Sequence, residues 1–399
     1  MPNLPRNKEC TGCLACIDSC KRGAISISIE HGLRYPNIDN DVCVNCGLCE
    51  KHCPVLNSFN HNKRDEIVVK GGWCTNAEVR RHSASGGAFS AMAMYALAEG
   101  GYAVGASLNE DNTVTHKVIH SIDELSVLQN SKYIQSNTTG IYEKVKNLLK
   151  NGERVLFSGT PCQTAALHSY LGKDYDNLVT VDVVCNGVPS NDAINVLIRE
   201  KKATKILSYR GKDFGWNDVY SQGVSYENEC GGVFFPLRSK DLFYRIFACG
   251  LTHRNSCCDC KFSSLPRYAD ITIADFWGIK RFEEEWNNGI SLIIANNKKG
   301  EDYISRCDKL HTFESSLEEC INANPRIANG RKYHGWHPVM LWRTPLRRMI
   351  GETLYEKIIL NEMPWKLLWG ILKIMTIVSN KKTIKKELSN EKNRNSNHF

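Results

Sequence analysis

Two cysteine runs near the start of the chain define its first domain: Cys10-Thr-Gly-Cys13-Leu-Ala-Cys16-Ile-Asp-Ser-Cys20 and Cys43-Val-Asn-Cys46-Gly-Leu-Cys49-Glu-Lys-His-Cys53-Pro54. Both have the spacing C-x2-C-x2-C-x3-C, and each cysteine of the second run follows its counterpart by 33 positions, which indicates an internal duplication. This spacing is used to hold cubane iron–sulfur clusters. We therefore predict two [4Fe-4S] clusters and a role in electron transfer.

The last cysteine of each run is predicted to bind the other run's cluster, as in two-cluster ferredoxins. One cluster is then held by Cys10, Cys13, Cys16 and Cys53, and the other by Cys43, Cys46, Cys49 and Cys20. A pair of four-thiolate zinc sites is the alternative, but the extra cysteine inside each run has no use on a tetrahedral ion. Lys21 stands where the pattern expects proline.

The composition limits the classes of function. A chain of 399 residues is long enough for two or three domains with a sizeable core. Most of its 18 cysteines stand at metal-ligand spacing and no apolar secretion segment follows Met1, so we expect a reducing cytoplasm. The formal charge of +8 is modest, and residues 379–399 hold six Lys or Arg against two Glu. No zinc-finger or helix-turn-helix pattern accompanies this tail, so we expect no nucleic-acid partner.

The chain divides into three predicted parts. Residues 1–60 form a ferredoxin-like two-cluster domain, and the polar stretch from Asn57 to Glu66 links it to the body. The body, residues 66–345, alternates β-branched runs with amphipathic helical stretches, such as a helix at 88–98 and a strand at 102–108. This pattern is typical of a mixed α+β or α/β fold with a partly parallel sheet. Residues 346–399 form a carboxyl-terminal helix and basic tail.

A third cysteine group is predicted from residues 154–201, which read as strand 154–157, helix 163–171, strand 178–184 and a further helix. The strands of such a unit are parallel, so Cys162 and Cys185 follow strands at the same edge of the sheet, where ligands bind in open α/β folds. With the pair Cys257 and Cys260 they make four ligands, enough for a third [4Fe-4S] cluster. The alternative is that Cys162 and Cys185 are small buried hydrophobes and that the pair holds zinc or nothing.

Five motifs follow one another along the body: Ser85-Gly86-Gly87-Ala88-Phe89, Ser131-Lys132-Tyr133, Gly159-Thr160-Pro161-Cys162-Gln163, Cys185-Asn186-Gly187-Val188-Pro189-Ser190 and Asp270-Ile-Thr-Ile-Ala-Asp275-Phe-Trp277-Gly278. Together they resemble the motifs of the family of coenzyme F420 hydrogenase/dehydrogenase beta subunits, over residues 5–345. The resemblance implies an iron–sulfur flavoprotein that passes electrons between clusters, FAD and a deazaflavin coenzyme, F420. Asn186 departs from the His that is usual at its position.

Candidate flavin contacts follow from this resemblance and from the residue types. Ser85-Gly86-Gly87 opens a predicted helix, whose first amides favour a phosphate, although an ordinary helix start needs no ligand. The basic residues Lys132, Arg210 and Lys212 would favour the negatively charged reduced flavin, with surface solvation as the alternative. Asp275 leaves a strand and either caps a helix or binds a ribityl hydroxyl. The candidate cofactor residues are Ser85, Gly86, Gly87, Lys132, Tyr133, Thr160, Arg210, Lys212 and Asp275.

Two functions fit these features. The first is a cytoplasmic iron–sulfur flavoprotein oxidoreductase whose flavin exchanges single electrons for hydride with a small molecule such as F420; no acid–base side chain is needed. The second is a non-catalytic electron-transfer subunit that docks on a partner oxidoreductase. A redox partner protein is expected in both. The apolar stretch Trp365 to Val378 is too short to span a bilayer, and it either docks on protein or lies on an anionic membrane surface beside Lys381 and Lys382.

Overall fold

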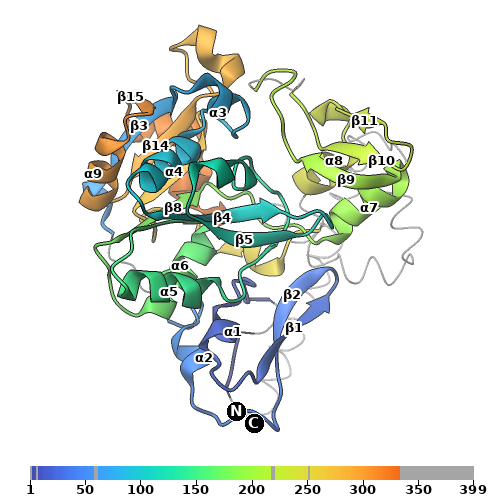
Figure 1. Cartoon of the computed structure of the whole chain (residues 1–399), viewed down its shortest axis with the longest axis vertical. Coiled ribbons are helices and arrows are strands. Elements are labelled where there is room, and N and C mark those ends of the chain that lie inside the picture. The colour runs from blue at the N-terminus through green and yellow to red at the C-terminus, as the bar shows by residue number, and fades with distance from the viewer. Residues whose placement is uncertain (1, 6–7, 58–61, 217–220, 250–251, 333–399) are drawn as a thin grey trace, which may run out of the picture. The chain divides into compact units, whose positions relative to one another are not determined.

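The structure is a computed structural model that describes residues 2–5, 8–57, 62–216, 221–249 and 252–332 (Figure 1). One compact unit comprises Met1–Arg245 and His253–Lys332. The predicted carboxyl-terminal helix and tail, residues 346–399, lie outside the described residues. No helix within the described ranges has the length and apolarity needed to cross a lipid bilayer.

The front of the chain repeats its backbone as it repeats its cysteines. Each run carries one short helix, α1 (Ala15–Ser19) or α2 (Leu48–Lys51). Each helix is entered through a left-handed residue, Leu14 with φ 61° or Gly47 with φ 74°, and these two positions are again 33 apart. Between the runs β1 (Ile25–Glu30) and β2 (Leu33–Ile38) pair as an antiparallel hairpin. The duplication is therefore structural as well as sequential.

The body is built on a nine-stranded mixed sheet with the order β15-β3-β14-β13-β8-β7-β4-β5-β6. Its centre, β13-β8-β7-β4, is parallel, and β14, β3, β15 and β5 join antiparallel. The expected partly parallel mixed fold is thus confirmed. The strands are β3 (Val68–Cys74), β4 (Tyr102–Leu108), β5 (Val114–Ile119), β6 (Ser136–Asn137), β7 (Val155–Gly159), β8 (Leu178–Val183), β13 (Ile271–Asp275), β14 (Ser291–Ala295) and β15 (Leu310–Glu314).

Helices cover both faces of this sheet, because side chains of successive strand residues point to opposite sides. Leu156 packs in one core with α4 (Ala88–Ala98) and α9 (Lys298–Arg306). Its neighbours Val155 and Phe157 pack in another core with α5 (Ile141–Lys150) and α6 (Pro161–Leu171) (Figure 1). Strands buried on both faces explain the continuous β-branched runs of the sequence.

A three-stranded antiparallel sheet, β11-β10-β9, stands apart from the main sheet in hydrogen bonding. Its strands are β9 (Ala203–Ser208), β10 (Ser225–Asn228) and β11 (Val233–Phe234). The remaining elements are α3 (Ala77–Arg81), α7 (Asp192–Lys201), α8 (Leu242–Cys249), α10 (Leu317–Ala323), α11 (Arg326–Asn329) and the short pair β12 (Asp259–Cys260) and β16 (Arg331–Lys332). The helix predicted at 163–171 begins earlier, because Pro161 occupies its first turn.

Candidate iron–sulfur and flavin site

The first predicted cluster set is gathered in the folded chain. Burial, together with the neighbouring thiolates of Cys10 and Cys53, raises the pKa of Cys13 to about 12. Burial also raises the pKa of Cys16 well above its ordinary value, as do the thiolates of Cys13, Cys10 and Cys53. Four thiols that oppose one another's ionisation in this way fit an iron cluster, whose positive irons would offset the thiolate charges.

The second set is more open to solvent. Burial raises the pKa of Cys49, and the Cys20 thiolate adds to this effect, so the fourth cysteine of the first run lies beside the second run. Cys43 is half-buried and Cys46 is exposed. The predicted crossing of the two runs is consistent with these neighbours, and Cys46 marks the side of this set that faces solvent.

The two-cluster domain is held against α5 by hydrogen bonds to buried groups. Thr138 and Tyr142 donate from their hydroxyls to the Cys13 carbonyl at 2.6 and 2.9 Å. Asp18, which is 7% exposed, accepts from the amides of Gly140 at 2.6 Å and Tyr142 at 3.0 Å, at the start of α5. Lys21 forms an ion pair with Glu143 of the same helix. The departure from proline at position 21 therefore supplies a contact to the body.

The third cysteine group assembles at the carboxyl edge of the parallel strands. Cys162 lies in the first turn of α6 after β7, and Cys185 follows β8. Burial raises the pKa of Cys162 well above its ordinary value, and the thiolates of Cys260, Cys185 and Cys257 raise it further. Segments far apart in sequence thus bring four thiols together. Cys162 and Cys185 are half-buried and not isolated hydrophobes.

Hydrogen-bond donors point at the sulfurs of this group. The Gly187 amide donates to Cys185 Sγ at 3.3 Å and the Val188 amide to Cys257 Sγ at 3.4 Å. Thr160 Oγ1 lies 3.1 Å from Cys162 Sγ. Donors of this kind stabilise thiolate ligands and tune cluster potentials.

Within the part of the chain that the structure describes, no three His, Cys, Asp or Glu side chains are placed to hold a single metal ion.

The Ser85-Gly86-Gly87 turn is packed against the sheet. A Cβ on Gly86 would lie 2.5 Å from the Gly72 carbonyl oxygen and 2.7 Å from the Ser291 nitrogen, so glycine is required by close backbone approach. The Gly86 amide donates to Ser291 Oγ at 2.9 Å, and the Gly87 amide to the Ala84 carbonyl at 3.0 Å. Both glycine amides, expected to face a phosphate, are therefore engaged within the protein.

A buried ion pair lies at the end of β13. Arg210, which is 3% exposed, donates from Nη1 to Asp275 Oδ2 at 2.9 Å. Trp216 Nε1 donates to the other carboxylate oxygen at 2.7 Å, and the guanidinium stacks 3.6 Å from the Trp216 ring centre. Asp275 therefore does not cap a helix, which was one of its two predicted roles. Although burial opposes it, the Asp275 carboxylate raises the pKa of Arg210.

Three basic side chains near the Ser85 turn, Lys212, Arg80 and Arg210, form a cationic cluster. The Lys212 ammonium donates to the carbonyls of Ser85 and Arg80, and it forms no ion pair within the described ranges. Burial, and then the charges of Arg80 and Arg210, lower the pKa of Lys212 to about 7. Arg80 itself pairs with Glu285 at 2.6 Å. An incoming anion would relieve this repulsion between cations, so the cluster fits a phosphate or a reduced flavin.

The other candidates divide between two places. Tyr133 belongs to the cationic cluster, since its side chain is an electrostatic neighbour of Arg210 and packs edge-on to Tyr244. Thr160 belongs to the third cysteine group. Lys132 instead donates to the Gln129 carbonyl, and burial lowers its pKa to about 7. Ser85, Lys212, Arg210, Asp275 and Tyr133 are thus brought together, and Lys132 is turned to a different set of partners.

Sequence reasoning missed several residues of these sites. Trp216 and Arg80 join the cationic cluster, yet neither stands in a recognisable motif. Arg267 and Asp182 are fully buried, and Arg267 Nη1 lies 3.9 Å from Asp182 Oδ2. Burial raises the pKa of Cys260, and the positive charge of Arg267 partly offsets this effect. A charged side chain in sequence is normally assigned to the surface, so only the fold reveals them.

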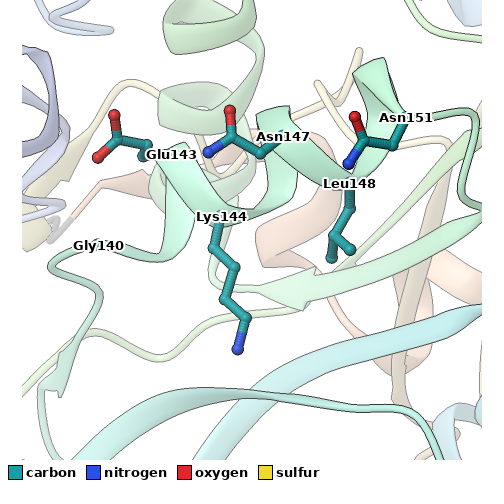
Figure 2. A pocket seen from close by; sticks show the side chains of 6 residues that line it. All are labelled: Gly140, Glu143, Lys144, Asn147, Leu148 and Asn151. Carbon is teal, nitrogen blue, oxygen red and sulfur yellow. The ribbon is translucent and has the colours of Figure 1, made fainter.

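A groove lies beside α5 (Figure 2). It has a volume of about 300 Å³ and is lined by Gly140, Glu143, Lys144, Asn147, Leu148 and Asn151. All of these belong to α5 and to the two residues that flank it, Gly140 and Asn151. No candidate cofactor residue lines the groove, so it is separate from the sites described above.

We expect Lys212→Met to change how stability depends on pH. An unfolded lysine keeps its proton to an ordinary value of 10.5, whereas the folded Lys212 loses it near pH 7. The unfolded state then binds more protons between these values, so wild-type stability should rise with pH relative to the variant, by up to about 1.4 kcal/mol per pH unit. Urea unfolding midpoints at pH 7, 8 and 9 test this.

Lys117→Met, which removes an exposed lysine of β5, serves as the control and should give a difference that does not vary with pH. If the stability of wild type relative to Lys212→Met falls or stays constant as pH rises, the result would contradict the burial of this ammonium.

Two family models match the chain. Residues 152–318 match the one described as the carboxyl terminus of the beta subunit of coenzyme F420 hydrogenase/dehydrogenase. Residues 9–57 match that of the 4Fe-4S dicluster domain. The two matched ranges hold all twelve cysteines of the three groups described above.

Individual relatives are more distant. One component of the F(420)H(2) dehydrogenase of Methanosarcina mazei, its F subunit, is 24% identical over an alignment of 167 residues, and the match covers 39% of this chain and 47% of that protein. The chain thus matches about half of the relative's length. Among solved structures, the F420-reducing [NiFe] hydrogenase complex from Methanosarcina barkeri, studied by xenon derivatization, contains a chain that matches with a TM-score of 0.44 and 13% identity. That match covers 74% of this chain and 94% of the other.

Proposed function

We propose that the chain is an iron–sulfur flavoprotein oxidoreductase, because residues 152–318 match the family model of coenzyme F420 hydrogenase/dehydrogenase beta subunits and residues 9–57 match that of the 4Fe-4S dicluster domain. The observation that carries the proposal is the third cysteine group. It stands at the sheet edge where open α/β folds bind ligands. Asp275 ends β13 at this same edge, because β13 runs parallel to β8.

Three [4Fe-4S] clusters are assigned to the three sets of thiols. Cys10, Cys13, Cys16 and Cys53 hold the first, Cys20, Cys43, Cys46 and Cys49 the second, and Cys162, Cys185, Cys257 and Cys260 the third. The mutual electrostatic effects within the first and third sets support this assignment. Two sulfurs of the third set accept hydrogen bonds from backbone amides, Cys185 Sγ from Gly187 and Cys257 Sγ from Val188.

The cationic cluster is assigned to FAD. When bound, the flavin supplies the exchange between single electrons and hydride. The positive charge of Lys212 is repelled by the charges of Arg80 and Arg210. An anionic group bound beside Lys212 would attract all three cations and so offset this repulsion. The Arg210–Asp275 pair fixes the Trp216 ring beside this charge. Ser85 helps to hold Lys212 through its carbonyl.

The small-molecule partner is proposed to be a hydride donor or acceptor of the deazaflavin class, as the names of the matched family and relatives contain F420. A redox protein or subunit exchanges electrons with the two-cluster domain, at residues 1–60. The alternative function is a non-catalytic electron-transfer subunit that binds clusters without flavin, its hydride chemistry residing in a partner chain.

Anaerobic purification followed by iron analysis and flavin extraction separates these two functions. The proposed enzyme should contain about twelve irons and one flavin per chain, because each cluster holds four irons. A protein with about twelve irons and no flavin would favour the electron-transfer subunit. About eight irons without flavin would exclude both the third cluster and the hydride step.

A further inference from the structure

The segment that carries Cys257 also contacts the first cysteine run. It begins at Arg254, whose amide donates to the Val188 carbonyl at 2.8 Å, and continues through the short 3-10 helix η4 (Asn255–Cys257). The Ser256 hydroxyl donates to the Cys10 carbonyl at 3.0 Å. Ser256 is covalently joined to Cys257. A single hydrogen bond therefore separates a candidate ligand of the first cluster from the residue next to a candidate ligand of the third.

Arg254 is a fully buried cation at this junction. Its Nη1 donates to the Cys10 carbonyl at 3.3 Å and its Nη2 to the Arg34 carbonyl at 2.6 Å. A third acceptor is the Gln135 side-chain oxygen, at 3.1 Å, so all three of these acceptors are neutral. A buried guanidinium needs compensating negative charge. Thiolate-ligated clusters on either side would supply it, because four thiolates outweigh the charge of the iron–sulfide core.

The first cysteine run is shaped around this side chain. Gly12 has φ 67°, and a Cβ on it would lie 2.5 Å from Arg254 Nη2 and 2.5 Å from Gln135 Nε2. Only glycine leaves room here. The contact between the run and the Arg254 segment is therefore close-packed, which keeps the distance between the two cluster sites fixed.

A second contact ties the two-cluster domain to the same region. The Ser190 hydroxyl donates to the His31 carbonyl at 2.6 Å, and the Asn191 amide donates to the Gly32 carbonyl at 3.0 Å. Ser190 lies in the turn that Cys185 begins. The β1–β2 hairpin and the first cysteine run thus both dock beside ligands of the third group.

We propose that Ser256 provides the electron route between the first and third clusters and that Arg254 is the positioning residue that holds this route and favours reduction of the flanking clusters. The inference rests on the proposed function, since it requires clusters at both sites. The route runs through the Cys10 carbonyl, the Ser256 hydroxyl and Cys257. With clusters bound at both sites, one electron would leave one cluster and be taken up by the other, with no bond made or broken and no proton moved.

The matched variants Ser256→Thr and Ser256→Val test the route, because their side chains have nearly the same shape and differ by the hydroxyl. Full-length protein is mixed anaerobically with less than one equivalent of reductant, and freeze-quench EPR follows equilibration between the front clusters and the third cluster. The threonine variant should behave as wild type. The valine variant should equilibrate several-fold more slowly with unchanged iron content. Ser305→Ala, which removes a hydroxyl of α9 that donates to the Asp302 carbonyl at 2.8 Å, should leave the rate unchanged.

Arg254 is tested by reduction potential, on which its positive charge acts directly, and the pair Arg254→Gln and Arg254→Lys separates that charge from the packing of the side chain. Arg254→Gln removes the charge and should lower the potential of the first or third cluster by about 60 mV, which is a tenfold loss in a one-electron equilibrium constant. Arg254→Lys keeps the charge and should retain most of the wild-type potential.

Equal EPR rates in the threonine and valine variants would overturn the route, and unchanged potentials in Arg254→Gln would overturn the role of Arg254. If the valine variant loses iron, the potentials of Arg254→Gln and Arg254→Lys decide whether the segment that carries Ser256 acts on the flanking clusters. Wild-type protein with fewer than three clusters would overturn the proposed function itself, and iron analysis shows this before any rate is measured.

Discussion

Replacing Cys257 by serine should remove about four of about twelve irons and the EPR signal of one cluster, while the two-cluster domain keeps its own signals. Cys257 is one of four thiols that meet at the carboxyl edge of β7 and β8. Loss of one ligand leaves the remaining thiolates with three attachment points for a four-cornered cluster. Iron and acid-labile sulfide determination after anaerobic purification measures the result.

The adjacent cysteine offers a matched control. Cys258 is 5% exposed and its thiol donates to the Arg254 carbonyl at 3.6 Å, so it is directed away from the group of four. Cys258→Ser should therefore retain all irons. Cys162→Ser, from a segment far away in sequence, should reproduce the loss caused by Cys257→Ser. Full iron content in Cys257→Ser would remove this residue from the ligand set.

The second large effect is expected from Asp275→Asn. This change keeps the size of the side chain and an oxygen for the Trp216 indole, but it leaves the Arg210 guanidinium buried without its carboxylate. Breaking a buried ion pair from one side costs about 3–5 kcal/mol. The urea midpoint should fall accordingly, and flavin content should fall with it, because Trp216 and Lys212 lie against the same pair.

Two further variants separate charge from shape. Asp213→Asn removes an exposed carboxylate next to Lys212 and should leave the midpoint nearly unchanged. The double variant Arg210→Met, Asp275→Asn removes both charges and should be more stable than Asp275→Asn alone. A single Asp275→Asn variant as stable as wild type would show that the pair is not buried in the protein in solution.

The sequence predicted those features that depend on local spacing. The cysteine runs and the β-α-β-α pattern at 154–201 are short-range signals, and both appear in the structure. The meeting of Cys162 and Cys185 could be anticipated because parallel strands end at one edge. Gly86 was expected to face a phosphate, but its need for glycine comes from the approach of β3 and β14, which no local pattern records.

Buried charges account for most of what sequence could not provide. Arg254 and Arg267 are both 0% exposed, yet both look like surface residues in the chain. Their burial is stabilised by partners from segments distant in sequence, such as Cys10 for Arg254 and Asp182 for Arg267. The short strands β10 and β11 were also missed, because elements of two to four residues carry too little periodicity to be distinguished from loops.

Helix α5 is capped by a residue from another domain. Its own N-cap is Gly140, which has no side chain to accept from the first amides, and Asp18 performs that task from 122 positions earlier. A chain cut near residue 60 would leave α5 with unpaired amides and the front domain with a carboxylate shaped for a missing helix. The two parts therefore cannot be exchanged as independent modules, and a transplanted front domain would have to bring α5 with it.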